Sequence, residues 1–182
     1  MIYPADAKGM VEKWLLQVEK QMIKSLRDII SKAVPDYLKH DLGKWVTNWP
    51  GQAILAARSI NWTAETTTSI TENTLPKMKE KQYKQLEEIV QMVRNGLSKA
   101  VRSTVVALIV LDVHARDVID KLEKKNVSSL NDFEWVSTMR YYLEKSTTEP
   151  NEMTVDLRYW KLSQLLIDFI FLGEHSNDFD HD

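Results

Sequence analysis

Residues 86–122, LEEIVQMVRNGLSKAVRSTVVALIVLDVHARDVIDKL, place apolar side chains at three- and four-residue steps for about ten helical turns. Between residues 104 and 113 the apolar side chains cover nearly all sides, which predicts burial all round. Asn95-Gly96 is the expected break in this pattern, and Ser98 can cap a helix that resumes after it. The stretch therefore predicts long helices and an all-α fold.

The segment before this stretch predicts further helices. One amphipathic face recurs at helical spacing near the N-terminus and ends around Pro35. It comprises Val11, Trp14, Leu15, Val18, Met22, Leu26, Ile29 and Ile30. Residues 63–74 are rich in threonine, whose β-branched side chain lowers helix propensity, so we expect a short or frayed helix there. The whole pattern is typical of an elongated bundle of long amphipathic helices.

The segment after residue 122 predicts shorter elements. Asn131, with Glu134 three residues later, resembles a capping box and predicts a helix that runs through Met139 and Tyr142. Beyond it, residues 153–159 alternate apolar and polar side chains, which indicates a short strand or hairpin near 153–160.

The composition excludes several classes of function. The chain has 182 residues, a net charge of −2 and no cysteine. Disulfides, thiolate zinc sites and cysteine nucleophiles are therefore excluded, and the lack of a basic excess argues against a nucleic-acid partner. No apolar run is long enough to span a membrane, so we expect a soluble, cytoplasmic chain without a membrane partner.

Several short motifs follow one another at intervals that suggest one family. The first is GMVEKWL at residues 9–15, followed by Trp45-Val46 with WPGQ at 49–52, Trp62-Thr63 with Glu65, HARD at 114–117, and DFEW at 132–135 with RYY at 140–142. Each motif alone is weakly specific, but in this order they resemble the linker of dynein heavy chains, just before the first AAA module. The sequence of residues 108–135 resembles axonemal dyneins more than cytoplasmic ones.

The resemblance implies a mechanical role. In the family the linker bends and straightens as nucleotide changes in the AAA ring, and this motion drives microtubule-based movement. The implied partners are the remainder of the heavy chain, meaning its linker and AAA ring, and through them other dynein subunits. The implied location is the cytoskeleton, in the axoneme of a cilium or flagellum.

Catalysis is not expected from this chain by itself. No G-x-x-x-x-G-K-[ST] segment is present, and the five glycines lie far apart, whereas a phosphate cradle needs clustered backbone N–H donors. We therefore expect no ATP binding, no cofactor, no metal ion and no enzymatic activity.

Two departures from the family pattern suggest a boundary near residue 146. Leu143 stands where the family usually has a tryptophan, and the match fades beyond about residue 146. We therefore expect a linker-like helical region at 1–146 and a divergent, partly disordered tail at 147–182. The chain would then be a fragment of a motor.

The residues that we expect to pack against other parts of the heavy chain lie in or near these motifs. They are Trp49, Trp62, His114, Arg116, Asp117, Phe133, Trp135, Arg140 and Tyr141. Large aromatic side chains dominate the energetics of cores and interfaces, and His114 with its charged neighbours is expected to tie one helix to the next.

Two other functions compete with this interpretation. A free-standing helical adaptor or scaffold would present one specific surface for binding a partner protein. A metal-assisted hydrolase would use His114 as a general base beside Asp112 or Asp117. The basic run Lys77, Lys79, Lys81 and Lys84 could also contact an acidic protein.

Overall fold

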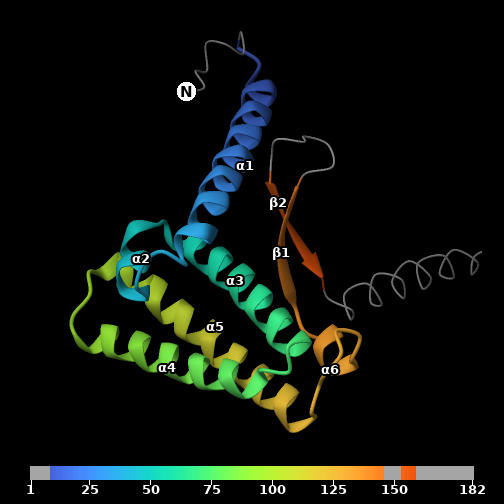
Figure 1. Cartoon of the computed structure of the whole chain (residues 1–182). Helices are drawn as coiled ribbons and strands as arrows, with labels where there is room; N and C mark the ends of the chain where they lie inside the picture. Colours follow the sequence, from blue (N-terminus) through green and yellow to red (C-terminus); the bar gives the residue numbers. More distant parts are fainter. Residues whose placement is uncertain (1–8, 146–152, 159–182) are drawn as a thin grey trace, which may run out of the picture.

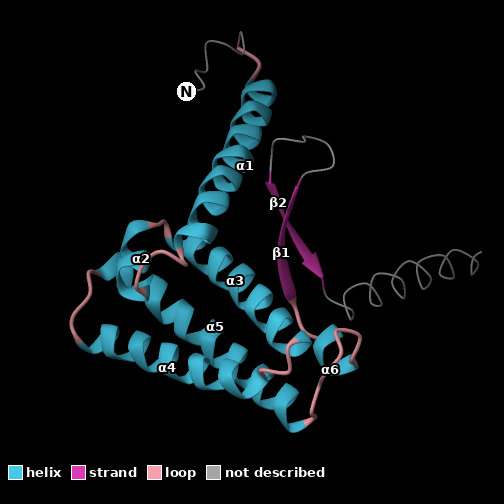
Figure 2. Cartoon of the chain, in the orientation of Figure 1, coloured by secondary structure: helices cyan, strands magenta, loops and turns pink. Residues whose placement is uncertain are grey.

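The computed structural model describes residues 9–145 and 153–158 (Figure 1). Over these residues it contains six helices and two strands. The helices are α1 Val11–Asp36, α2 Leu42–Asn48, α3 Gly51–Thr71, α4 Leu75–Arg94, α5 Lys99–Lys124 and α6 Phe133–Val136; the strands are β1 Arg140–Lys145 and β2 Met153–Arg158. The expected fold of long helices is confirmed, and colouring by secondary structure shows how little of the described chain is strand (Figure 2).

Three long helices form the body, and α1 projects from it. Helices α4 and α5 run side by side in opposite directions, α3 lies against them, and α1 leaves one end of α3 like an arm (Figure 1). The β1–β2 hairpin lies beside α1 and returns toward the end of α3. The described part of the chain is therefore elongated, as its sequence predicts.

The break between α4 and α5 falls where the sequence places it. Helix α4 ends at Arg94, and Gly96 adopts a φ of +82°, a left-handed conformation that glycine tolerates without strain. The Ser98 hydroxyl then accepts a hydrogen bond from the Val101 N–H at 3.5 Å and caps α5. Local sequence signals alone therefore determine this boundary.

Two apolar clusters hold the body together. The first surrounds the fully buried Trp45 where α1, α2, α3, α4 and α5 meet. The second surrounds Trp62 and Trp135, where α3, α4, α5 and α6 meet. Both clusters lie toward the ends of the long helices, so each motif tryptophan named here packs at a junction between elements.

The expectation that residues 104–113 are buried all round is wrong. Val105 and Leu108 are fully buried, but Val106 is 50% exposed and Val110 is 66% exposed. Helix α5 packs mainly against α3 and α4, with smaller contacts to α2 and α6, and these neighbours leave Val106 and Val110 exposed. Within residues 104–113, Val106 and Val110 are thus exposed, while the other side chains are buried or half-buried.

The expectation of a frayed helix at residues 63–74 is also wrong, because α3 runs without interruption through Thr71. The hydroxyls of Thr63, Thr67 and Thr68 each donate to the carbonyl four residues earlier, at 2.7–3.1 Å. Thr63 and Thr66 are also completely buried against other elements. Tertiary packing therefore overrides the low helix propensity of threonine here.

The helix expected from Asn131 through Tyr142 is wrong beyond its first turn. Helix α6 ends at Val136, and Arg140–Lys145 forms β1 instead. Asp132, not Asn131, stands at the N-cap, and its carboxylate accepts from the backbone N–H groups of Ser128 and Ser129. It therefore holds the preceding loop.

The strand expected near 153–160 is confirmed. Strand β2 pairs antiparallel with β1, with Tyr141 opposite Leu157 and Leu143 opposite Val155. The expected boundary at residue 146 falls between these paired strands, and the division into 1–146 and 147–182 stays a prediction. The expectation of a partly disordered tail concerns residues that lie mostly outside the described ones.

Candidate functional site

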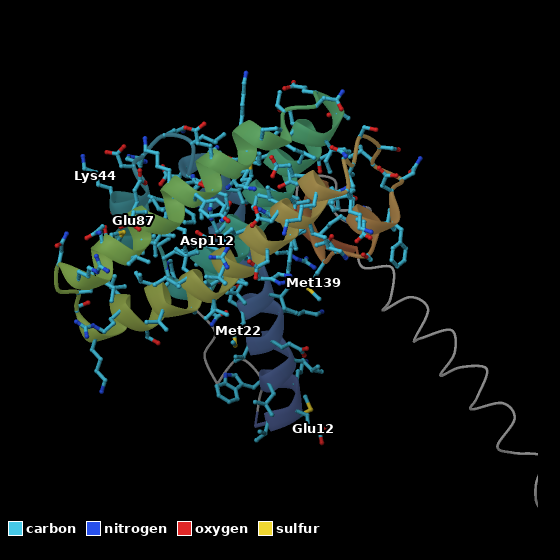
Figure 3. All side chains as sticks on the ribbon, turned by 90° about the horizontal axis from the view of Figure 1, so that it is seen from below. Glu12, Met22, Lys44, Glu87, Asp112 and Met139 are labelled. Atoms are coloured by element: carbon cyan, nitrogen blue, oxygen red, sulfur yellow. The ribbon has the colours of Figure 1, made fainter. Side chains whose placement is uncertain are left out.

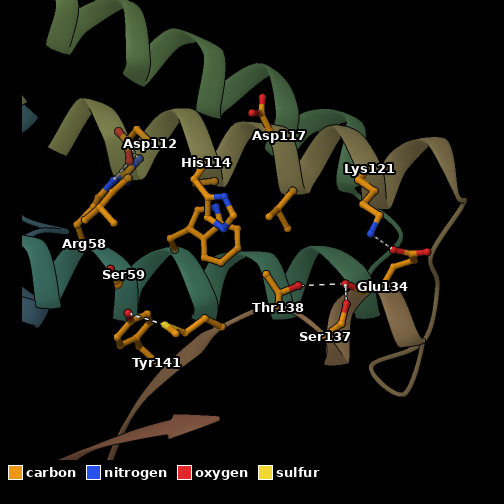
Figure 4. Close-up of a pocket in the computed structure, with 15 residues that line it drawn as sticks. Arg58, Ser59, Asp112, His114, Asp117, Lys121, Glu134, Ser137, Thr138 and Tyr141 are labelled. Atoms are coloured by element: carbon orange, nitrogen blue, oxygen red, sulfur yellow. Dashed lines mark hydrogen bonds and ion pairs between the residues drawn. The ribbon is translucent and has the colours of Figure 1, made fainter. Parts of the chain in front are cut away.

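A buried ion pair lies at the centre of the molecule. Arg58 of α3 donates to both carboxylate oxygens of Asp112 of α5, from Nε at 2.9 Å and from Nη2 at 3.2 Å. Each residue is only 1% exposed. The two-pronged geometry matches a guanidinium to a carboxylate, which is the arrangement that best compensates for burial of both charges (Figure 4).

The neutral side chains of Tyr37 and Gln85 extend this ion pair into a hydrogen-bond network. The hydroxyl of Tyr37 accepts from Nη1 of Arg58, and it also accepts from Nε2 of Gln85 at 2.8 Å. Nη2 of Arg58 donates to Oε1 of Gln85 at 3.0 Å. The network thus connects the end of α1 with α3, α4 and α5 through side chains alone.

Burial and charge act in opposite directions on these groups. Burial by itself lowers the pKa of Arg58, but the charge and hydrogen bond of Asp112, together with Tyr37 and Glu65, raise the pKa above the ordinary value. Burial raises the pKa of Tyr37, although the positive charge of Arg58 works against that rise. Arginine is therefore charged and the phenol neutral at physiological pH, as the hydrogen bonds require.

Reasoning from the sequence missed Arg58, although a signal was present. Arg58 lies four residues after Ile54 and four before Trp62, so it occupies the buried face of α3. Asp112 lies four residues after the buried Leu108 on α5 in the same way. A cation and an anion on two apolar helix faces predict a pair, because neither tolerates burial alone.

A pocket of about 540 Å³ opens beside this pair. It lies between α3, α5 and the segment from α6 to β1, and Arg58 and Asp112 form part of its wall (Figure 4). Four of the predicted packing residues line it, namely Trp62, His114, Asp117 and Tyr141. The structure therefore brings together motif residues that are almost 80 positions apart in the chain.

Two more predicted residues, Trp135 and Arg140, lie at the second apolar cluster, and a third, Phe133, is exposed. The rings of Trp62 and Trp135 lie 6.0 Å apart, and the guanidinium carbon of Arg140 lies 5.8 Å from the centre of the Trp135 ring. Trp135 is 1% exposed, so it packs within this chain, whereas Phe133 is 57% exposed and contributes to the surface.

The remaining predicted residues lie on separate surfaces. Arg116 contacts its sequence neighbour Asp117 at 2.7 Å and lies over the ring of Tyr83. His114 is exposed at the edge of the pocket. Trp49 lies far from all of these, at the other end of the body, and donates from Nε1 to Asp36 at 2.9 Å. The nine residues therefore do not form a single site.

Within residues 9–145 and 153–158, no group of three or more histidine, aspartate or glutamate side chains could hold a metal ion. Lys79 contacts Asp120 and Glu123, and Lys81 contacts Glu65, so half of the basic run is paired within the fold. None of the described helices is long and apolar enough to cross a membrane.

Comparison with known proteins gives strong matches. The chain is 46% identical over 158 residues to human dynein axonemal heavy chain 3. It is 40% identical over 161 residues to human dynein axonemal heavy chain 12 and 42% identical over 142 residues to human dynein axonemal heavy chain 1. These matches cover 87%, 87% and 78% of this chain. No family model matches the chain.

Over the matched stretch, the chain is a homologue of dynein heavy chains. More particularly, the relatives named here are axonemal heavy chains, so the resemblance to the axonemal group is confirmed. The chain spans only 3–5% of the length of these relatives.

Proposed function

We propose that this chain forms the C-terminal part of the linker of an axonemal dynein heavy chain, and that its role is mechanical. The observation that carries the proposal is the 46% identity to an axonemal heavy chain, together with the ordered motifs between residues 9 and 142. The chain would relay ATP-driven changes of the AAA ring into movement along microtubules. ATP hydrolysis itself would belong to other parts of the heavy chain.

The structure supports a partner along the arm. Most of α1 projects beyond the body, and its only buried residue is Ala33. Large apolar side chains are exposed along it, namely Met10, Val11, Leu15, Leu16, Met22, Ile23 and Leu26. Contiguous apolar surface of this kind marks an interaction site. We assign it to the remainder of the heavy chain, and place the protein in the axoneme of a cilium or flagellum.

The exposed valines of α5 support the same assignment. Val106 and Val110 stand one turn apart on the uncovered side of the helix, and His114 follows one turn later at the pocket. A second apolar surface therefore lies on the body, separate from the one on α1. A segment of a larger assembly is expected to contact neighbours on more than one side.

A chimaeric motor tests the proposal. The matching segment of an axonemal dynein heavy chain is replaced by this chain, and microtubule gliding velocity and ATPase rate are measured. We expect the chimaera to glide, while a motor that lacks the segment hydrolyses ATP without sustained gliding. Gliding no better than that of the deleted motor would refute the linker role.

The uncovered surfaces also favour one competing function, the free-standing adaptor. An adaptor would fold cooperatively and remain monodisperse until it meets its partner, whereas a linker segment separated from its neighbours would self-associate. Sedimentation velocity over a range of concentrations distinguishes the two behaviours.

His114 allows a direct test of the hydrolase alternative. Its side chain is exposed, so we expect His114→Ala to change the free energy of unfolding by less than about 0.5 kcal/mol. We also expect no hydrolysis of ester or phosphoester substrates by the wild-type chain, with or without added zinc. An activity that disappears in His114→Ala would favour the hydrolase.

A further inference from the structure

Helix α1 joins the helices of the body at its C-terminal end, and strand β2 of the hairpin lies beside it. The first two thirds of α1 present exposed apolar side chains, whereas Ala33 is fully buried and Tyr37, directly after the helix, is 7% exposed. The contacts at residues 33–37 join α1 to the helices of the body, whereas the contact with β2 joins it to the hairpin. A change in the direction of α1 relative to the helical body therefore requires the contacts at residues 33–37 to change.

Two helices bind the end of α1 through its carbonyl groups. The indole Nε1 of Trp45 in α2 donates to the carbonyl of Ala33 at 3.1 Å. The amide of Asn61 in α3 donates to the carbonyl of Val34 at 3.1 Å. The Ala33 carbonyl also accepts from the backbone N–H of Tyr37 at 3.1 Å, so the indole is its second donor. Carbonyls at the end of a helix are open to such donors, and side chains from neighbouring helices give this end a fixed orientation.

Three hydrogen bonds and one ring contact hold the side chains at the same end. Trp49 donates to the carboxylate of Asp36 at 2.9 Å, and the hydroxyl of Tyr37 accepts from Arg58 and Gln85. The ring of Tyr37 also packs edge-on against Trp45, with ring centres 5.2 Å apart. We call the five donors Trp45, Trp49, Arg58, Asn61 and Gln85 the α1 clamp.

The clamp draws on every helix near the base of the arm. Its members belong to or directly follow α2, α3 and α4, and Arg58 is in turn held by Asp112 of α5. Donors that approach from several directions restrict both the tilt and the rotation of α1. By contrast, the Tyr83–Asp120 hydrogen bond joins α4 to α5 and does not involve α1.

We propose that the α1 clamp sets the direction of α1, and that displacement passes between α1 and the body through it. The force relay rests on the linker role proposed above, whereas the fixed direction of α1 does not. Within this joint, the hydroxyl of Tyr37 is the positioning group, because it accepts hydrogen bonds from Gln85 and from Arg58 of the buried Arg58–Asp112 pair. The guanidinium carbon of Arg58 also lies 5.5 Å from the centre of the Tyr37 ring, a contact that Tyr37→Phe retains.

Distance measurement tests the joint in this chain alone. Because the sequence has no cysteine, Lys20→Cys on α1 and Glu88→Cys on α4 provide unique sites for two spin labels, and both positions are exposed. We expect a narrow distance distribution for the wild-type background. Tyr37→Phe should broaden or shift it, and Tyr83→Phe, the same chemical change outside the clamp, should leave it unchanged.

Gln85→Met serves as a second test, because it removes the hydrogen bond to Tyr37 while keeping the length of the side chain. Far-UV circular dichroism shows whether each variant is folded. An unchanged distribution in folded Tyr37→Phe, or in folded Gln85→Met where Tyr37→Phe does not fold, overturns the proposal. An equal broadening in Tyr83→Phe also overturns it, because the effect would then reflect general loosening.

The chimaeric motor provides the functional readout. If the clamp transmits displacement, Tyr37→Phe lowers the ratio of gliding velocity to ATPase rate, while Tyr83→Phe does not. If Tyr37→Phe only reduces the amount of folded motor, the ratio stays unchanged. An unchanged ratio would therefore contradict the proposal that the clamp transmits displacement. If the distances change as expected but the wild-type chimaera fails to glide, the joint stands and the linker role fails.

Discussion

At the scale of single residues, the pair Arg58–Asp112 shows how burial constrains charge. Both side chains are almost fully buried, and each compensates for the other's loss of hydration. The pair alone contributes little net stability relative to well-packed apolar residues, but removal of one partner leaves a charge that nothing neutralises. Its chief effect is therefore to specify how α3 and α5 fit together.

Asp112→Ala should consequently lower the free energy of unfolding by about 3–5 kcal/mol. The double variant Arg58→Met with Asp112→Leu should recover much of that loss, because it leaves no unpaired charge. Urea denaturation of the three proteins measures both effects. A double variant that is less stable than Asp112→Ala would show that the ion pair stabilises the fold beyond the mutual neutralisation of two buried charges.

The raised pKa of Tyr37 predicts a dependence of stability on alkaline pH. Because burial keeps the phenol protonated above its ordinary pKa, the unfolded chain loses this proton first as pH rises. The contribution of the protonated Tyr37 phenol to the free energy of unfolding is fully present below the unfolded pKa near 10. It is lost as pH rises through the higher folded pKa.

Urea midpoints measured between roughly pH 8 and pH 11 test this sign. The wild-type chain should lose more stability over that range than Tyr37→Phe, which has no phenol at this position. Equal slopes for the two proteins would mean that the phenol of Tyr37 ionises equally in both states.

At the scale of elements, α3 stays helical through packing against other elements, because threonine lowers the helix propensity of its second half. Within that half, Thr63 has a second role, because it also binds the hairpin. The Thr63 hydroxyl donates to the carbonyl of Ser59 at 2.8 Å and accepts from the Tyr141 N–H at 3.1 Å. One side chain thus fastens β1 to α3.

Thr63→Val should therefore release the start of β1. The shape of the side chain changes little, but the Tyr141 N–H loses its acceptor, which should cost about 1–3 kcal/mol. Hydrogen exchange of the Tyr141 amide should accelerate more than exchange within α5. Thr68→Val is the control, because Thr68 is exposed and bonds only within its own helix; similar acceleration there would exclude this explanation.

At the scale of the whole molecule, the uncovered α1 arm governs solution behaviour. Exposed Met22 lies on α1 (Figure 3). Leu15, which is also exposed, precedes it by seven residues and so lies on the same side of the helix. Burial of their apolar surface would be favourable at about 25 cal/mol per Å². The isolated chain should therefore self-associate through α1.

Leu15→Gln with Met22→Gln should shift the sedimentation profile toward monomer without lowering the thermal midpoint, because neither residue belongs to either core cluster. Lys13→Gln with Lys24→Gln provides a control on exposed polar positions of the same helix. Unaltered association in the apolar variant would show that another surface, such as the one around Val110, causes it.

The candidate site could be predicted only in part. Trp62, His114, Asp117 and Tyr141 were found through motifs, and the structure places them around one pocket. Trp135 was also found, but its burial within this chain was not foreseen, because a motif does not say which side of a tryptophan is covered. No motif marks Arg58, whose importance depends on where α5 places Asp112.

The sequence by itself determined the features that depend on neighbours a few residues apart. These include the long helices, the break at Gly96 with the cap at Ser98, and the alternation that marks β2. Tertiary structure alone decided which faces are covered, why α3 continues through its threonines, and why Arg140–Lys145 is a strand. The reason is that a partner such as Asp112 lies 54 positions from Arg58, and packing, not local spacing, brings such partners together.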